Sequence, residues 1–212
     1  MIAQFCDEIA AAAAVDGAAL TIVSTTGGRL FVHSTDAMSF DLDELQFSLG
    51  EGPCIEAVAT GAPVFANALT AMATIERWPG FATAATALGA GAEYAFPLLH
   101  AGVSVAVLQT YRRQPGPLQP AHIEAAAALL ASFRIRILRE LVERLSDVSV
   151  VPAGVRDRAE VHQATGMVAV QLDLDVDAAL ARLRAEAFAN DMPVVMLAHD
   201  VVDRQFRFHR DL

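Results

Sequence analysis

The side chains best suited to binding chemistry lie near the end of the chain. Arg204, Arg207 and Arg210 are interleaved with Phe206 and Phe208. Guanidinium groups form paired hydrogen bonds with phosphates and base edges, and aromatic rings stack on unpaired bases. The segment therefore fits contact with an unpaired stretch of nucleic acid. A solvated chain end whose aromatic rings pack on the preceding helices fits the same residues, and both interpretations stay open.

Patterns for catalysis and metal binding are sparse. Cys54 and His100 are the one obvious nucleophile–base pair of the first domain, and nothing in their spacing brings them together. The sequence has no HExxH, no CxxC and no group of histidines with zinc-ligand spacing. A haem ligand would have to come from an isolated histidine, namely His33, His100 or His122. We therefore expect no enzyme activity and no bound metal or cofactor.

Composition restricts the class of partner. At 212 residues and 54% hydrophobic, the chain can bury a sizeable core in one or two domains. The net charge of −10 argues against a general nucleic-acid binder. All fifteen basic residues are Arg, and residues 146–212 hold seven of them against eleven Asp and Glu. Any RNA contact must therefore come from a local cluster of Arg side chains.

The chain carries no pattern of export. Its two cysteines, Cys6 and Cys54, do not make a disulfide framework. Asp7 and Glu8 interrupt the N-terminal apolar run, and no basic segment precedes it. The sequence therefore predicts a cytoplasmic protein without a membrane span.

The first 120 residues alternate between helical and extended patterns. Helices are predicted at 2–15, 55–60 and 82–90, with a helix or loop at 36–48 and a loop or short helix at 66–74. Strands are predicted at 18–25, 29–34, 63–65, 93–99 and 103–111. The first two strands flank Thr26-Gly27-Gly28 and should form a hairpin.

A long helix is predicted from residue 121 to residue 148. Its apolar seam of Leu138, Leu141, Leu145 and Val148 has the 3-4-3 spacing of a coiled coil. The seam favours a connector that pairs two copies of the chain, although packing within one chain fits it as well. Residues 146–155, which include Pro152, are predicted to be a linker.

The last part of the chain has the periodicity of three short amphipathic helices. Apolar residues recur at helical spacing around Val161 and Val168, then Leu180 and Leu183, then Leu197 and Val201. Asp175 can cap the second helix, and Pro193 suits the first turn of the third. Helices of this kind bury their apolar stripes against one another, so a small bundle is expected.

Residues 2–140 resemble a GAF domain. The resemblance lies in the patterns Gly50-x-Gly52-Pro53-Cys54-x-x-Ala57-x-x-x-Gly61-x-Pro63-Val64, Tyr94-Ala95-Phe96-Pro97-Leu98 and Gly102-Val103-x-Val105-Ala106-Val107-Leu108. It implies a sensory module with a twisted antiparallel sheet, helices packed on it and a pocket on one face. That pocket could take a small apolar or aromatic effector. Its candidate wall residues, which fit a plain core equally well, are Phe31, Phe65, Trp78, Phe81 and Phe96.

Residues 155–208 resemble an ANTAR domain, a three-helix RNA-binding module of bacterial antitermination regulators. The patterns are Gln163-Ala164-x-Gly166-Met167, Ala179-Leu180-x-x-Leu183-Arg184-x-x-Ala187 and Pro193-Val194-x-x-Leu197-Ala198-x-x-Val201-Val202. Thr165 and Met192 stand where many members carry a basic residue, and Asp173 stands where many have Gly. The side chains expected to contact RNA are Arg158, His162, Gln163, Thr165, Arg182, Arg184, Arg204 and Arg207.

These observations predict an α+β fold: a GAF-like antiparallel sheet flanked by helices over residues 1–145, ending in the long connector helix, and an ANTAR-like three-helix bundle over residues 156–212. The expected function is a signal-responsive homodimer that binds RNA hairpins in a transcript leader and promotes antitermination. The alternative is a dimerisation or protein-interaction module that has no RNA affinity and keeps a ligand-sensing GAF domain. Charge separates the two, because RNA binding needs Arg side chains that converge on one face.

Overall fold

The computed structural model describes residues 2–23, 29–146, 153–190 and 192–209. For residues 137–146 and 153–157 it describes the backbone alone. The chain divides into two compact units, Met1–Ser149 (unit 1) and Val150–Leu212 (unit 2). The predicted Thr26–Gly28 turn, most of the predicted linker and the seam side chains of Leu138, Leu141, Leu145 and Val148 lie outside the described residues. So do the side chain of Arg156 and all of Arg210.

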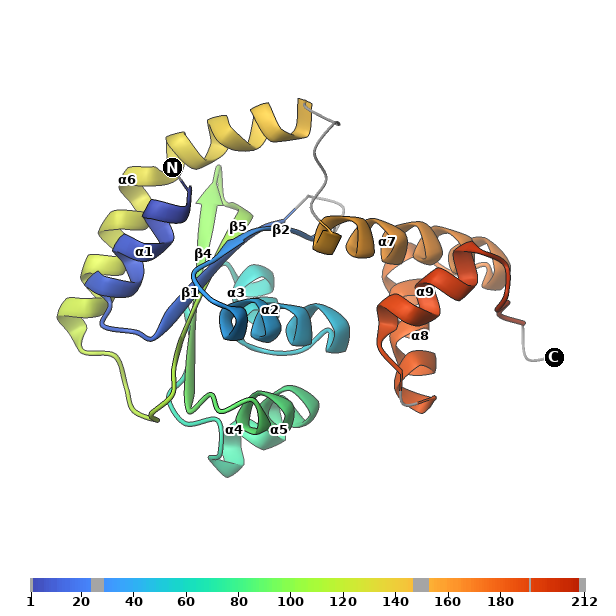
Figure 1. Ribbon diagram of the computed structural model, residues 1–212, viewed down its shortest axis with the longest axis horizontal. Coiled ribbons are helices and arrows are strands. Elements are labelled where there is room, and N and C mark those ends of the chain that lie inside the picture. The colour runs from blue at the N-terminus through green and yellow to red at the C-terminus, as the bar shows by residue number, and fades with distance from the viewer. Residues whose placement is uncertain (1, 24–28, 147–152, 191, 210–212) are drawn as a thin grey trace. The chain divides into compact units, whose positions relative to one another are not determined.

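Unit 1 is built on a five-stranded antiparallel sheet (Figure 1). The sheet has the order β2-β1-β5-β4-β3. The strands are β1 (Gly17–Val23), β2 (Arg29–Ser34), β3 (Val64–Ala66), β4 (Ala92–His100) and β5 (Val103–Arg112). β4 and β5 form a hairpin in which Ala95 pairs with Gln109, and β1 joins the other side of β5 with Thr21 opposite Val107. The predicted antiparallel sheet with flanking helices is thereby confirmed.

Helices cover both faces of this sheet (Figure 1). One face carries α1 (Ile2–Ala12) and α6 (Pro120–Ser146), and the other carries α2 (Ala37–Leu49), α3 (Pro53–Thr60) and α5 (Pro79–Ala87). Successive strand residues point to opposite faces. On β4, Tyr94, Phe96 and Leu98 therefore join the core beneath α1 and α6, whereas Ala95 joins the core beneath α2 and α3.

Local signals account for the helix bounds. Asp36 caps α2 by accepting the backbone N–H of Ser39 over 2.7 Å, and Gly50 ends α2 at φ 71°. Two helices differ most from the sequence-based expectation. A short helix α4 forms at Met72–Arg77, and α5 starts at Pro79 rather than at residue 82. Proline suits the first turn of a helix, because its missing N–H has no intrahelical partner there.

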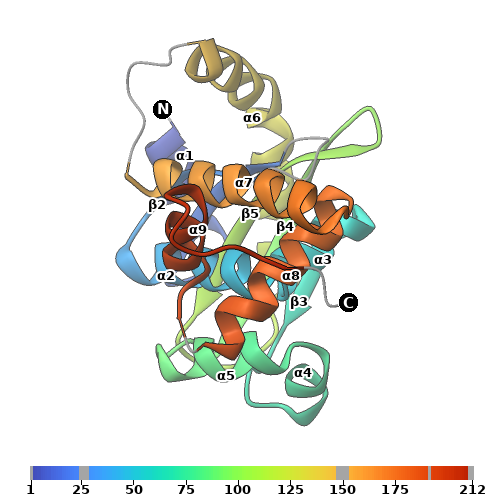
Figure 2. The ribbon, with the colours of Figure 1, turned by 90° about the vertical axis from the view of Figure 1, so that its right-hand side faces the viewer.

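Unit 2 is a bundle of three helices, α7 (Ala153–Leu172), α8 (Val176–Ala189) and α9 (Val194–Val202) (Figure 2). Asp175 caps α8 by accepting the N–H of Ala178 over 2.8 Å, as its position predicts. Asp173 follows α7 in the left-handed region at φ 59° and ends the helix in a conformation that glycine adopts more often. The bundle core holds the apolar stripes of all three helices, namely Val161, Ala164, Val168, Ala179, Leu183, Ala187, Val194, Leu197, Ala198 and Val201.

None of the helices in the described part of the chain combines the length and the apolar character needed to cross a membrane.

Candidate functional site

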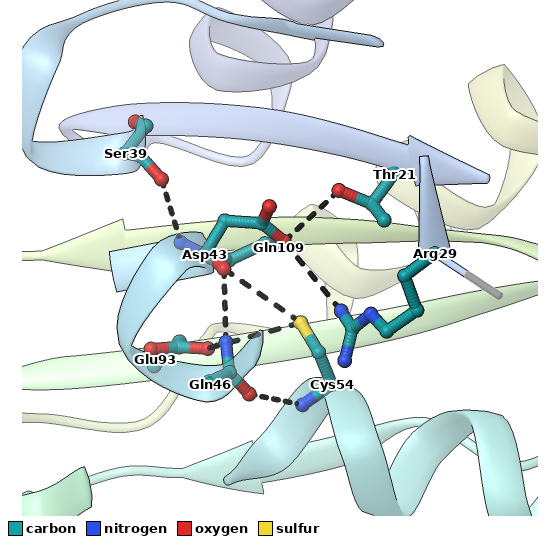
Figure 3. A network of polar contacts seen from close by, with 8 residues as sticks. All are labelled: Thr21, Arg29, Ser39, Asp43, Gln46, Cys54, Glu93 and Gln109. Atoms are coloured by element: carbon teal, nitrogen blue, oxygen red, sulfur yellow. Dashed lines mark hydrogen bonds and ion pairs between the residues drawn. The ribbon is translucent and has the colours of Figure 1, made fainter. Parts of the chain in front are cut away.

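A buried layer of polar side chains lies between the sheet and helices α2 and α3 of unit 1 (Figure 3). Strand alternation places Thr21, Glu93 and Gln109 on the face of the sheet that α2 and α3 cover. Other elements contribute the remaining members of this polar layer: Arg29 from β2, Ser39, Asp43 and Gln46 from α2, and Cys54 from α3. Their exposed fractions are all 8% or less, so these contacts are formed away from water.

Gln46 is the centre of the polar layer. Its Oε1 accepts the backbone N–H of Cys54 over 2.6 Å. Its Nε2 donates to Oε1 of Glu93 over 2.7 Å and to Oε1 of Gln109 over 2.9 Å. The side chain thus ties the start of α3 to both central strands, β4 and β5.

The turn before α3 fits closely around Gln46. Gly52 has φ 126°, and a Cβ added to it would lie 2.6 Å from Oε1 of Gln46. A larger residue would meet both a strained backbone and a steric clash. Pro53 then starts α3 and places the N–H of Cys54 toward Gln46. Packing around one amide therefore explains Gly52, Pro53 and Cys54 of the Gly-x-Gly-Pro-Cys pattern, and the end of α2 explains Gly50.

Arg29 and Asp43 contact each other at one end of the polar layer, apart from the hydrogen bonds of Gln46. Oγ1 of Thr21 donates to Oδ1 of Asp43 over 2.9 Å, and Nη2 of Arg29 lies 3.5 Å from the same oxygen. Both charged side chains are almost completely buried, at 7% and 1% exposure. The carboxylate of Asp43 is thus the counter-ion of the one guanidinium group in this layer.

Burial changes the acidity of two further groups. The pKa of the Cys54 thiol is raised well above its usual value, first by desolvation and then by the nearby charge of Glu93. Desolvation, followed by the charge of Asp43, likewise raises the pKa of the Glu93 carboxyl group. Sγ of Cys54 lies 3.9 Å from Oε1 of Glu93 and 3.8 Å from Oε1 of Gln109. The thiol is therefore held in its neutral, poorly nucleophilic form.

The aromatic residues proposed as pocket walls do not gather in one place. Phe65 and Phe96 lie on the face covered by α1 and α6, with ring centroids 5.4 Å apart. Trp78 and Phe81 belong to the core on the opposite face, and Phe31 packs edge-on against Phe40 of α2. A single aromatic wall would need all five on the same side of the sheet. The structure instead divides Phe65, Phe96, Trp78 and Phe81 between two separate cores.

The catalytic candidates are also apart. Cys54 is buried in the polar layer, whereas His100 is exposed at the end of β4. Among the described residues there is no group of three or more His, Cys, Asp and Glu side chains that could hold a metal ion. His33, the first of the isolated histidines, is half-buried on β2.

In unit 2, the eight candidate RNA-contacting residues fall into three degrees of exposure. Gln163, Arg182, Arg204 and Arg207 are exposed, and His162 and Arg184 are half-buried. Arg158 and Thr165 are buried at 1% exposure, and Oγ1 of Thr165 donates to the backbone oxygen of Val161 over 2.7 Å. Burial therefore leaves the other six at least partly accessible at the surface.

Two of these residues mark opposite sides of α8. Positions 182 and 184 are separated by about 200° around a helix. Arg184 lies on the side of His162, whose pKa is lowered by burial and then by the charges of Arg158 and Arg184. Arg182 pairs with Glu186 over 2.8 Å, and its guanidinium group lies 5.4 Å from the ring centroid of Phe208. Arg182 and Arg184 therefore do not lie on one face of α8.

The C-terminal aromatic rings pack onto the bundle. Phe208 is only 4% exposed, and its backbone N–H donates to Oε1 of Gln171 on α7 over 2.9 Å. Its ring lies 5.1 Å from that of Phe206. Of the two interpretations of this segment, packing on the preceding helices describes Phe208, while Arg204 and Arg207 remain at the surface.

Comparison with known proteins gives a consistent result for unit 1. The model of the GAF domain family matches residues 2–137. A domain of a two-component sensor histidine kinase protein from Sinorhizobium meliloti aligns with 68% of this chain and 92% of its own, at 20% identity and a TM-score of 0.52. The GAF3 domain of Slr1393 from Synechocystis, in its photoproduct state, aligns with 69% of this chain and 98% of its own, at 15% identity and a TM-score of 0.51. No curated protein matches the chain.

Proposed function

Because this chain belongs to the GAF domain family, with a GAF sensor domain over residues 2–137, we propose that it is a signal-responsive regulator that binds RNA through unit 2. In this proposal, unit 2 is an ANTAR-like module that holds RNA hairpins of a transcript leader so that transcription continues. The sensor domain controls that binding, and the chain performs no chemistry of its own.

One observation carries the proposal: the residues of the C-terminal pattern divide into a core and a surface. Its apolar members, such as Ala164, Leu183 and Leu197, are buried together between the three helices. Gln163 and Arg182 remain exposed on α7 and α8. This is the arrangement expected when an apolar pattern builds a scaffold and polar positions between its members contact a partner.

The charges available for RNA are local. Arg182 is already paired with Glu186, but both side chains are partly exposed. Exposed ion pairs contribute at most about 1 kcal/mol, so a phosphate group can replace the carboxylate at little cost. Arg204 and Arg207 add two more exposed guanidinium groups after α9. These three side chains could bind phosphates even though residues 146–212 carry more acids than arginines.

Control by the sensor is proposed to act as a population shift. An effector or a protein partner that binds one state of the GAF domain better than the other would shift the balance between them. In a homodimer paired through α6, that shift would change how two copies of unit 2 present their arginines. The proposal requires a difference in affinity between the two states, and no covalent step.

The test is a binding titration of the full-length chain with a small two-hairpin RNA across a salt series. We expect affinity to fall steeply with salt, because phosphate contacts release counter-ions. The combined variant Arg182→Ala, Arg204→Ala, Arg207→Ala should lose at least about tenfold in affinity and lower the salt slope by about two. The matched control removes three exposed arginines from unit 1, as Arg113→Ala, Arg134→Ala, Arg136→Ala, and should bind as the parent does.

Absence of binding at low salt, or an equal loss in both variants, would contradict RNA recognition by unit 2. A specific feature then favours a second function, namely protein interaction. Val170 is 82% exposed, Phe188 is 76% exposed and Met196 is 55% exposed on unit 2. In that case Phe188→Ser should weaken self-association of the full-length chain in sedimentation experiments, while the three-arginine variant should leave it unchanged.

A further inference from the structure

Glu93 is a carboxyl group enclosed in the sensor domain with few hydrogen bonds. It is completely buried on β4. Oε1 accepts one N–H from Gln46 and lies within 3.9 Å of the Cys54 thiol. Oε2 has no hydrogen-bond partner in the part of the chain that the structure describes. A buried carboxylate needs several donors or a cation to offset the loss of water, and Glu93 receives one amide N–H and a weak thiol contact.

The orientation of Gln46 limits what it can supply. The backbone N–H of Cys54 can only donate, so the side-chain atom that faces it over 2.6 Å must be the amide oxygen. The amide nitrogen then faces the sheet and shares its two N–H groups between Glu93 and Gln109. Glu93 therefore receives only one of them.

Among the described residues of the polar layer, a single guanidinium group, that of Arg29, faces two carboxyl groups and cannot balance both of them. The ionisable groups that face Glu93 are Arg29 from β2, Asp43 from α2 and Cys54 from α3. From β5, the amide of Gln109 contacts the same layer, and Tyr111 lies opposite Glu93 in the strand register with its hydroxyl group bonded to Asp36. Arg29 is paired with Asp43 at 3.5 Å. The negative charge of Asp43 acts on Glu93 more strongly than the positive charge of Arg29 does. The two acids of the polar layer thus have different roles: Asp43 forms the ion pair with Arg29, and Glu93 forms no ion pair within the described residues.

We infer that α2 and α3 dock on the sheet only when Glu93 carries a proton, so that the sensor domain itself responds to pH. A buried neutral carboxyl group with one unmade hydrogen bond is far less unfavourable than an unpaired buried charge. Docking takes up a proton because the pKa of Glu93 is raised by burial in the folded domain. The inference concerns unit 1 alone and does not rest on RNA binding by unit 2.

The direction of the pH response follows from this linkage. The unfolded or undocked chain holds the proton only below its ordinary pKa of 4.5. The docked state holds it to higher pH, so docking is most stable in acid and weakens as pH rises from about 4.5 toward the raised pKa. A rise in pH should therefore loosen Gln46 and the start of α3 from β4 and β5.

The first measurement needs no variant. Infrared or 13C NMR spectra of the full-length chain, labelled at Glu carboxyl carbons, should show one protonated carboxylic acid at neutral pH. A spectrum at that pH with carboxylates only would overturn the inference. In Glu93→Gln the signal should vanish, and in the matched control Glu124→Gln, an exposed residue of α6, it should persist.

The second measurement tests the docking itself. Hydrogen exchange of the α2 and α3 amides, corrected for the intrinsic pH dependence, should show an opening constant that grows with pH by up to about tenfold per unit. Glu93→Gln should remove this dependence, because its amide is neutral at every pH. A pH-dependent opening that remains in Glu93→Gln would assign the proton to another group and overturn the inference. If Glu93→Gln does not fold, the spectrum of the parent chain decides.

Discussion

The two units bury ionisable side chains in opposite senses. Unit 1 encloses an acid, Glu93, and burial favours its neutral, protonated form. Unit 2 encloses part of a base, His162, and burial together with Arg158 and Arg184 favours its neutral, deprotonated form. Burial disfavours the charged form in both units, so Glu93 binds its proton more tightly in the folded protein, whereas His162 loses its proton more easily. Raising the pH should therefore weaken the docked state of unit 1, and lowering it should weaken unit 2.

The architecture explains why the acid is buried more deeply than the base. A central strand is covered on both faces, so each polar residue on it faces a layer of helices. Glu93 and Gln109 have no route to the surface from β4 and β5. A helix in a three-helix bundle has flanks, and His162 and Arg184 lie there, half-exposed. Three substitutions test this difference. One removes the central side chain of the polar layer, one strains the turn before α3, and one removes the imidazole group of unit 2.

The largest effect is expected from Gln46→Ala. Removing this side chain leaves the N–H of Cys54 and acceptor oxygens of Glu93 and Gln109 without their partner. Each buried group left unpaired costs about 1–3 kcal/mol, so unit 1 should lose at least about 3 kcal/mol of unfolding free energy. Urea unfolding followed by Trp78, the only tryptophan of the chain, reports on unit 1. The exposed Gln114→Ala serves as control. A loss below about 1 kcal/mol would show that the layer contributes little.

A smaller loss, of about 2 kcal/mol, is expected from Gly52→Ala. The new Cβ would lie 2.6 Å from Gln46, and the backbone there has φ 126°. Gly116→Ala separates the two causes, because Gly116 has φ 147° with open space around its Cβ position. Urea unfolding of both variants should show the larger loss for Gly52→Ala. Equal losses would attribute the whole effect to the backbone and none to contact with Gln46.

The smallest effect is expected from His162→Gln. The pKa of His162 is lowered in the folded unit, so its neutral form stabilises unit 2 above pH 6.5 and that stability is lost as pH falls below 6.5. The side chain is half-exposed, so solvent screening should keep the change below about 1 kcal/mol. Hydrogen exchange of α7 and α8 between about pH 7.5 and about pH 5.5 should show the loss in the parent and not in the variant. His209→Gln, an exposed residue, should behave as the parent. A stability that rises with acidification would reverse the sign assigned to unit 2.

The sequence predicts much of the fold because its periodicities are strong. Alternation and turn residues place the five strands close to their observed bounds, and the glycine and proline pattern indicates the GAF domain that the family match confirms. Pro79 is misassigned as a break before a helix, although a proline in this position starts one. The apolar stripes of unit 2 predict its core, because residues three or four positions apart lie on the same face of a helix and can be recognised from local sequence alone.

The polar layer is not predicted, because its members are far apart in the sequence. Gln46 contacts Glu93 and Gln109 across separations of 47 and 63 residues. A signal was nevertheless present. Glu93 and Gln109 each interrupt an apolar strand in the middle of the sheet, where a polar side chain must find a buried partner. The prediction of pocket walls rests on aromatic residue type alone, and residue type does not say which face of a strand a side chain occupies.

The two cysteines lie on opposite faces of the sheet. Cys6 belongs to the core beneath α1 and α6, where burial raises the pKa of its thiol to about 12, and Cys54 belongs to the core beneath α2 and α3. Neither thiol can react with an alkylating reagent until its own helices lift from the sheet. Pulsed alkylation followed by mass analysis of the two peptides would therefore time the opening of each face separately, and so show which side of the sensor domain moves when a signal arrives.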